Sequence, residues 1–177
     1  MTGDRWAGIA RGAHFSRCGR YRYALRRTFP AGQGTVLFVG LNPSTADAHV
    51  DDPTIRRCMG FAAAWGHREL WVANLFALRS PYPDALLGAD DPVGPRNDRW
   101  LASLRKRADR VIVAWGNHGA LLGRAERVAR RLGPVECLGR NASGAPAHPL
   151  YRPADARPRP WTAPGPAACA GRVAAQP

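Results

Sequence analysis

Four short apolar runs punctuate the chain, and longer stretches of mixed apolar and polar residues separate them. The runs cover about residues 35–40, 70–76, 110–115 and 135–138. Apolar runs of this length, bounded by turn residues, are typical of buried strands. Because helix-length stretches lie between them, the runs predict the strands of a parallel sheet.

The stretches between the runs carry helix signals. Asp52 suits the N-cap of a helix over residues 53–65, with a proline at its first position. Further helices are expected over residues 95–108 and, with Asn117 as N-cap, up to about residue 132. The alternation of strands and helices predicts an α/β fold, a four-stranded parallel sheet sandwiched by helices.

Two further segments differ in composition from these elements. Residues 15–29 alternate basic with aromatic or aliphatic positions, which is typical of an amphipathic edge strand or a short arm. Beyond Pro153, Pro, Ala and Arg dominate, and we expect this part to be disordered. At 177 residues the chain is long enough to bury one core. It therefore predicts a single domain over residues 15–153 and a tail over 154–177.

The charge balance points to a polyanionic partner. The chain has 26 Lys and Arg against 13 Asp and Glu, a formal net charge of +13, and Lys106 is its single lysine. Arginine suits bidentate contact with phosphates, which favours DNA, single- or double-stranded, as the partner. The alternative is a compositional bias towards arginine, of the kind that accompanies high genomic GC content.

We expect neither a membrane nor a metal partner. No apolar stretch approaches the length of a membrane span, and the N-terminus lacks the apolar core of a signal peptide. A cytoplasmic monomer is therefore expected. The four cysteines, Cys18, Cys58, Cys137 and Cys169, are far apart and include no Cys-x-x-Cys pair. This spacing favours reduced, structural thiols and no metal or other cofactor; a cluster built from four distant cysteines is the alternative.

Each predicted strand leads to a characteristic polar group. Asn42 follows the first strand, Asn74 lies in the second, Asn117 follows the third, and His148 lies in the loop after the fourth. The carboxyl ends of parallel strands meet at one edge of the sheet, which is where open α/β sheets bind ligands. The sequence therefore predicts that these groups face a single crevice.

Four segments resemble the signatures of the uracil-DNA glycosylase superfamily, in the same chain order. Residues 40–43 (GLNP) resemble the water-activating motif in its Asn-containing form, and residues 72–79 (VANLFALR) resemble the strand whose Asn reads the pyrimidine edge. Residues 113–116 (VAWG) resemble the third strand, and residues 148–150 (HPL) resemble the motif that opens the minor-groove loop. The stretch 18–161 resembles more closely a bacterial family named only as domain of unknown function 1643.

The glycosylase resemblance implies an enzyme that releases a deaminated or modified, uracil-type base from DNA by hydrolysing the N-glycosidic bond. Asn42 and His148 would be catalytic: Asn42 orients the attacking water, and His148 stabilises negative charge on the departing base. Asn74, with Leu41 and Phe61, would bind the base. An Asn side chain offers one acceptor and two donors, which match the N3–H and O4 edge of uracil. No metal or cofactor is implied.

Six further residues are expected to contact the nucleic acid. Hydroxyl and backbone donors can grip phosphates, and an apolar or aromatic side chain can wedge into the stack that a flipped base leaves. The expected contacts are Ser44, Thr45, Arg79, Ser143, Leu150 and Tyr151.

Several of these residues also suit ordinary structural roles. Asn42 is typical of turns, His148 precedes a proline in a loop, and Asp52 suits a helix cap, although Asp51 and Asp52 together could supply an acid catalyst. The more active glycosylases of the superfamily carry Asp where this chain has Asn42, which predicts slow hydrolysis or a different base. The acidic insertion 47–57 has no counterpart in the superfamily pattern.

Two other functions are compatible with the same residues. One is an enzyme of the same fold that acts on free nucleotides or nucleosides and has little affinity for DNA. The other is a nucleic-acid-binding module that has kept the fold without the hydrolysis. Salt-dependent DNA binding is expected of the glycosylase and of the binding module, but not of the enzyme that acts on free nucleotides. Turnover of a base then distinguishes the glycosylase from the binding module.

Overall fold

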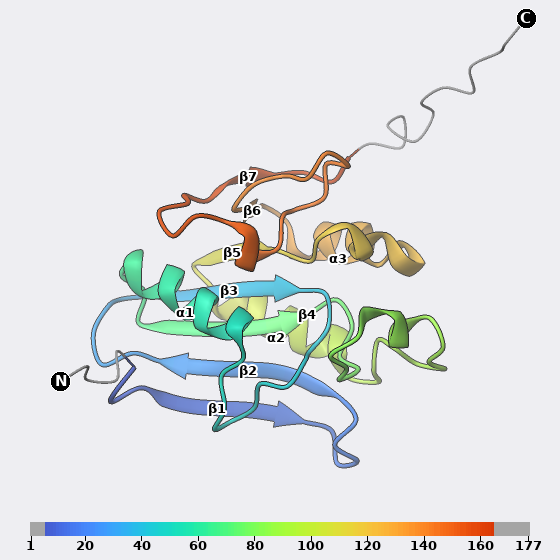
Figure 1. Ribbon diagram of the computed structural model, residues 1–177, viewed down its shortest axis with the longest axis horizontal. Helices are drawn as coiled ribbons and strands as arrows, with labels where there is room; N and C mark the ends of the chain where they lie inside the picture. Colours follow the sequence, from blue (N-terminus) through green and yellow to red (C-terminus); the bar gives the residue numbers. More distant parts are fainter. Residues whose placement is uncertain (1–5, 165–177) are drawn as a thin grey trace, which may run out of the picture.

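A mixed seven-stranded sheet is the centre of the structure, a computed structural model that describes residues 6–164 (Figure 1). The strands lie side by side in the order β1-β2-β4-β3-β5-β6-β7. Their bounds are β1 (Ala10–Phe15), β2 (Arg22–Thr28), β3 (Thr35–Gly40), β4 (Glu69–Asn74), β5 (Arg110–Val113), β6 (Val135–Cys137) and β7 (Arg159–Trp161).

The four strands predicted from the apolar runs are β3, β4, β5 and β6, and they pair in parallel. β4 lies on one side of β3 and β5 on the other, with β6 beyond β5. Three antiparallel strands extend this centre, β1 and β2 beyond β4, and β7 beyond β6. The prediction of a purely parallel, four-stranded sheet is therefore wrong, because each added strand is interrupted by arginine or proline and lacks a plain apolar run.

β1 and β2 form an antiparallel hairpin at one end of the sheet. The edge strand expected within residues 15–29 is an inner strand, because β2 pairs with both β1 and β4 and leaves β1 at the edge. Arg27 of β2 has a side chain with no exposed surface, and its guanidinium pairs with Asp51 at 2.5 Å. That ion pair allows a basic residue to lie in an inner strand. Regular structure begins before residue 15, the predicted start of the domain.

Part of the predicted tail belongs to the sheet, since β7 pairs with β6. The Trp161 side chain is buried, its ring meets Trp115 edge-on at a centroid distance of 5.4 Å, and its Nε1 donates to the carbonyl of Gly144. The expectation of disorder beyond Pro153 is wrong for this segment, because burial of a tryptophan outweighs the irregular local composition. The remainder of that predicted tail, from residue 165, lies outside the described residues.

Two of the three predicted helices form as continuous α-helices, and Asp52 caps the first by accepting a hydrogen bond from the Ile55 amide at 2.8 Å. The third is divided, because the backbone of Leu122 has a φ of 54° and interrupts the helix. Gly116, rather than Asn117, precedes its first turn. The helical elements described are α1 (Pro53–Ala64), η1 (Pro83–Leu86), α2 (Asn97–Arg107), η2 (Asn117–Gly123), α3 (Arg124–Leu132) and η3 (Pro149–Tyr151).

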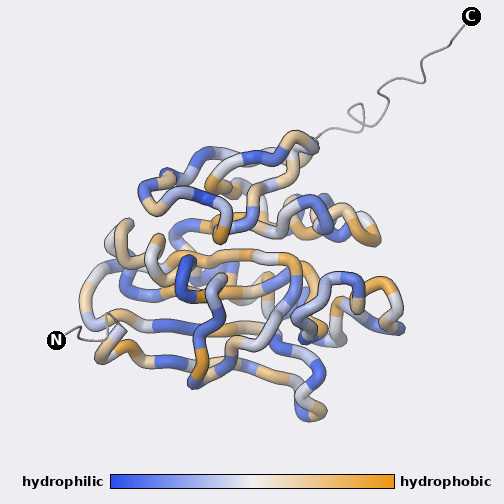
Figure 2. Tube along the Cα trace, viewed as in Figure 1, coloured by the Kyte–Doolittle hydropathy of each residue, from blue (hydrophilic) through white to orange (hydrophobic). Residues whose placement is uncertain are grey.

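Helices cover both faces of the sheet, as expected. α1 packs on one face with Phe38 and Val72, whereas α2 and α3 pack on the other with Leu37 and Val39. Successive strand residues point to opposite faces, so the apolar run of β3 serves both layers. Figure 2 shows this hydrophobic run along β3 and more hydrophilic positions along the outer hairpin. None of the helices described here is long and apolar enough to cross a membrane.

Candidate functional site

A cleft of about 490 Å³ opens at the carboxyl ends of β3, β4 and β5. The loop after β3 leads to α1 on one face of the sheet, and the loop after the neighbouring β5 leads through η2 to α3 on the other. Loops that diverge in this way leave a crevice between them, which is the usual ligand site of an open α/β sheet. The charged and amide side chains that line it, with two histidines, are Arg22, Asn42, Asp52, Asn74, Asn117, His118, Asn141 and His148.

Asn74 ends β4 with its side chain in the cleft and only 5% of its surface exposed. Its backbone carbonyl accepts a hydrogen bond from Nδ2 of Asn97 at 3.0 Å, which holds the strand end. Its own Oδ1 is buried and has no hydrogen-bond partner among the residues described. A buried amide oxygen is costly to leave unpaired, so this atom is suited to a ligand.

Asn42 follows β3 and uses its amide nitrogen within the protein. Nδ2 donates to the carbonyl of Ser80 at 2.8 Å and to that of Pro43 at 3.2 Å. The Ser80 amide donates in turn to the Pro43 carbonyl. Asn42 therefore joins the loops that follow β3 and β4, and Oδ1 is the remaining group with which it can orient a water or ligand.

His148 precedes η3 and is partly buried at the cleft. Its Nδ1 accepts a hydrogen bond from the Leu150 amide at 3.4 Å. Burial lowers the pKa of His148 below its ordinary value, and the negative charge of Asp52 opposes that shift. The imidazole is therefore neutral at pH 7, with the proton on Nε2, because Nδ1 is the acceptor. Nε2–H is a donor of the type expected for stabilising a departing base.

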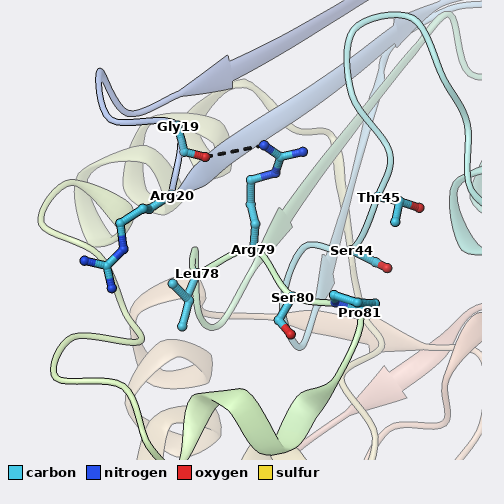
Figure 3. A pocket seen from close by; sticks show the side chains of 8 residues that line it. All are labelled: Gly19, Arg20, Ser44, Thr45, Leu78, Arg79, Ser80 and Pro81. Atoms are coloured by element: carbon cyan, nitrogen blue, oxygen red, sulfur yellow. Dashed lines mark hydrogen bonds between the residues drawn. The ribbon is translucent and has the colours of Figure 1, made fainter.

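Other predicted contacts fall in the cleft or in a groove beside it. Leu41, Ser44 and Tyr151 line the cleft. Ser44 also lines the groove with Thr45 and Arg79, and Figure 3 shows these side chains around a shared hollow. The Arg79 guanidinium donates to the Gly19 carbonyl at 3.4 Å. Because the cleft and groove share Ser44 and the loop after β4, they form one continuous surface.

Three predicted site residues line neither the cleft nor the groove. Phe61 is 1% exposed on the inner side of α1, with its ring against Trp65 at a centroid distance of 5.4 Å. It belongs to the core, because its helix turns that side towards the sheet. Ser143 donates to Oδ1 of Asn117 at 2.8 Å, next to the cleft, and Leu150 is 41% exposed on η3.

Two charged residues of the cleft were not predicted as site residues from the sequence. Asp52 was expected as a helix cap and, with Asp51, as an alternative acid; it fills the capping role and also lines the cleft. Arg22 is 2% exposed, and Nη1 donates to the Ala46 carbonyl at 2.5 Å. In the sequence, Arg22 stands among several alternating arginines, and nothing in that pattern distinguishes it from its neighbours.

No cluster of three or more His, Cys, Asp or Glu side chains with the geometry of a metal site occurs within residues 6–164. Cys18, Cys58 and Cys137 are free thiols in the part described, and Cys169 lies outside it. Burial raises the pKa of the Cys58 thiol, which lines the cleft, far above its ordinary value. This thiol is therefore protonated and unreactive at pH 7.

Comparison with known proteins identifies the family of the chain. The family model described as protein of unknown function (DUF1643) matches residues 22–150. That stretch runs from β2 into η3 and contains every charged, amide and histidine side chain of the cleft named above. No curated protein and no solved structure matches the chain.

Proposed function

The chain belongs to the DUF1643 family, a family of unknown function, and we propose that it is a hydrolase that releases a uracil-type base from DNA. The observation that carries this proposal is the meeting of Asn42, Asn74 and His148 in one cleft. They come from three distant parts of the chain, and each has a side-chain group free to meet a ligand. The sequence resemblance to the uracil-DNA glycosylase superfamily supports the same reaction.

In this proposal the base is read by Asn74 once it has left the DNA stack. Oδ1, which lacks a partner within the described chain, accepts the ring N–H, and Nδ2 donates to the neighbouring carbonyl oxygen. Nε2–H of His148 donates to the other carbonyl oxygen of the base. As the C1′–N bond breaks, its electron pair moves onto the base, and these hydrogen bonds stabilise the developing negative charge.

Water completes the hydrolysis at C1′ of the sugar. Oδ1 of Asn42 orients the water, but an amide cannot take its proton. Asp52 is the one carboxylate among the described residues that line the cleft, and in this proposal it accepts that proton and stabilises positive charge on the sugar. One of its oxygens already accepts from the Ile55 amide, so the second performs this role. The released base then takes a proton from solvent.

The groove beside the cleft is suited to the DNA backbone. Ser44 and Thr45 supply hydroxyl donors, and Arg79 supplies a charged group. The formal net charge of +13 favours association with a polyanion. Hydrolysis of the same bond in a free nucleotide is the second candidate, and it is favoured by the buried Arg22 inside the cleft, where a nucleotide phosphate would find a donor.

The deciding experiment is base release from labelled single- and double-stranded oligonucleotides that contain uracil, hypoxanthine, xanthine or a thymine mismatch. We expect abasic sites with the native protein, and their loss with Asn42→Ala and Asp52→Asn. Asn74→Asp replaces the donor Nδ2 by an oxygen and is expected to change or abolish the choice of base. Arg130→Gln, on the exposed surface of α3, changes the net charge by the same amount as Asn74→Asp and is its control.

Other outcomes of this experiment would support a different function or contradict the assigned roles. Salt-sensitive DNA binding without release of any base would support a binding module and contradict the hydrolase. If neither release nor binding occurs, turnover of free nucleotides becomes the test of the second candidate. Equal release by the native protein and all three cleft variants would contradict the roles assigned to Asn42, Asp52 and Asn74.

A further inference from the structure

Three arginines are buried in the described part of the chain, and they differ in their partners. Arg27 pairs with Asp51 at 2.5 Å, and Arg124 pairs with Asp98. Arg22 is 2% exposed, yet no carboxylate of the described residues lies within ion-pair distance of it. A buried guanidinium without a counter-ion is costly, because it has lost its water without gaining an opposite charge.

The hydrogen bonds of Arg22 are also incomplete. Nη1 donates to the carbonyl of Ala46, which ties β2 to the loop after β3, but Nε has no partner among the residues described. Burial lowers the pKa of Arg22 to about 10, with Asp52 as the largest opposing influence. The group therefore keeps its positive charge at pH 7. In the contacts described, one of the five N–H donors of Arg22 is bonded to the protein.

Arg22 and Asn74 lie at the same cleft with complementary unused atoms. Arg22 offers a charged donor, and Oδ1 of Asn74 offers an acceptor that has no partner within residues 6–164. Both residues are at least 95% buried, so water satisfies them poorly. A ligand that satisfies both must present an N–H group and an oxygen that carries negative charge.

We propose that Arg22 binds an anionic oxygen of the ligand inside the cleft, next to the N–H group that Asn74 accepts. This inference rests on the proposed function for the identity of that oxygen, which is a carbonyl oxygen of the departing base. The C1′–N electron pair delocalises onto it, and the guanidinium stabilises the charge without giving up a proton. The substrate class is therefore a base with a carbonyl beside a ring N–H. An amino group in place of the carbonyl would meet the donors of Arg22 and be rejected.

The same chemistry can come from a second source, the phosphate of a free nucleotide. Binding of small probes separates the two sources without any need for turnover or DNA. The probes are uracil, 5-fluorouracil, cytosine and inorganic phosphate, each titrated into the full chain and followed by NMR chemical shifts. 5-Fluorouracil has the more acidic ring N–H and thus the greater anionic character, so it is expected to bind more tightly than uracil, and cytosine least tightly.

Arg22→Gln is expected to weaken binding of 5-fluorouracil about ten- to hundredfold, the range for loss of a hydrogen bond to a charged group. It should also remove the preference for 5-fluorouracil over uracil. Arg130→Gln removes an exposed charge on α3 and should leave every dissociation constant unchanged. Thermal unfolding checks that each variant is folded. If Arg22→Gln does not fold, Arg22→Lys, which keeps the charge but loses the planar fork, is expected to weaken binding about tenfold.

The outcomes separate this inference from the proposed function. Loss of phosphate binding in Arg22→Gln, with no binding of any base by the native protein, would support the anionic site and contradict base release. Equal affinities of the native protein and the folded Arg22 variant for every probe would overturn the proposal. So would a native protein that binds none of the four probes.

Discussion

Gly40 and Asn74 lie opposite each other at the ends of the paired strands β3 and β4. A Cβ atom at residue 40 would lie 2.9 Å from Nδ2 of Asn74, which is closer than such atoms normally approach. Glycine at the end of β3 therefore leaves the space that the Asn74 side chain occupies. The motif that contains Gly40 thus shapes the cleft twice, through the space beside Asn74 and through the side chain of Asn42.

Gly40→Ala is expected to displace the amide of Asn74 and to slow base release about a hundredfold, as misplacement by about 1 Å commonly does. The free energy of unfolding should change by less than about 1 kcal/mol, because the atom that must move ends a side chain. The matched control is Gly60→Ala in α1, where an added Cβ meets no atom within 4 Å. It should stabilise the helix by about 1 kcal/mol and leave release unchanged. Equal effects of the two changes on release would contradict the packing argument.

His148→Ala is expected to slow base release about a hundredfold, because it removes the Nε2–H donor that the proposed mechanism assigns to the departing base. His148→Gln places an amide donor near the same point and should recover part of that loss. Single-turnover rates on a uracil-containing strand measure the chemical step directly. Full activity of His148→Ala would exclude the donor role.

The pKa of His148 also predicts how stability depends on pH. Its pKa in the folded protein lies below the ordinary value of 6.5. As the pH falls below about 6.5, the unfolded chain takes up a proton that folded His148 does not, so stability decreases until the lowered pKa is reached. Above that window this histidine makes no pH-dependent contribution. Urea unfolding of the native protein and His148→Gln should therefore show a difference that changes only on the acidic side.

Asn97 fixes the end of β4 through hydrogen bonds to its backbone. It is fully buried, and its Nδ2 donates to the carbonyls of Asn74 and Leu75 at 3.0 and 2.9 Å. Asn97→Ala is expected to lower the free energy of unfolding by about 2–3 kcal/mol, chiefly because the Asn74 carbonyl loses its side-chain partner. Asn141→Ala removes a more exposed amide hydrogen bond and should cost less than about 1 kcal/mol. Chemical denaturation measures both.

Arg79 is expected to contribute to DNA affinity through the phosphates. Arg79→Ala should weaken binding to all sequences alike and reduce the slope of log affinity against log salt by about 1. Arg130→Ala removes a charge from α3 instead and should leave that slope unchanged. Fluorescence anisotropy over a range of salt concentrations measures the slope. An unchanged slope for Arg79→Ala would place the DNA backbone elsewhere.

Local signals in the sequence predicted the centre of the fold correctly. The apolar runs of β3 and β4 bury residues on both faces of the sheet, and Asp52 caps α1 through an amide three residues away. Such features depend on residues close together in the chain. β7 was missed because its stability comes from pairing with β6 and from burial of Trp161, contacts that span more than 20 residues.

The residues of the candidate site likewise fall into those that the sequence predicts and those that depend on the assembled fold. Asn42, Asn74 and His148 meet because parallel strands place their carboxyl ends together, which a strand assignment already implies. The burial of Phe61 follows the helical spacing of the apolar positions in α1, whereas the burial of Arg22 depends on side-chain packing that no spacing rule provides. Phe61 turns into the core under α1, and Arg22 is an arginine whose burial is visible only once the sheet is assembled.

The outermost strands bear on how the protein meets other copies of itself. An open sheet exposes unpaired backbone groups at each end, and a further strand can add there and begin aggregation. β7 at one end is three residues long and contains Pro160, which has no N–H to offer. β1 at the other has an irregular register between His14 and Phe15 and carries Arg11. Both edges are therefore poor templates, and the sheet resists growth by strands added from other copies of the chain.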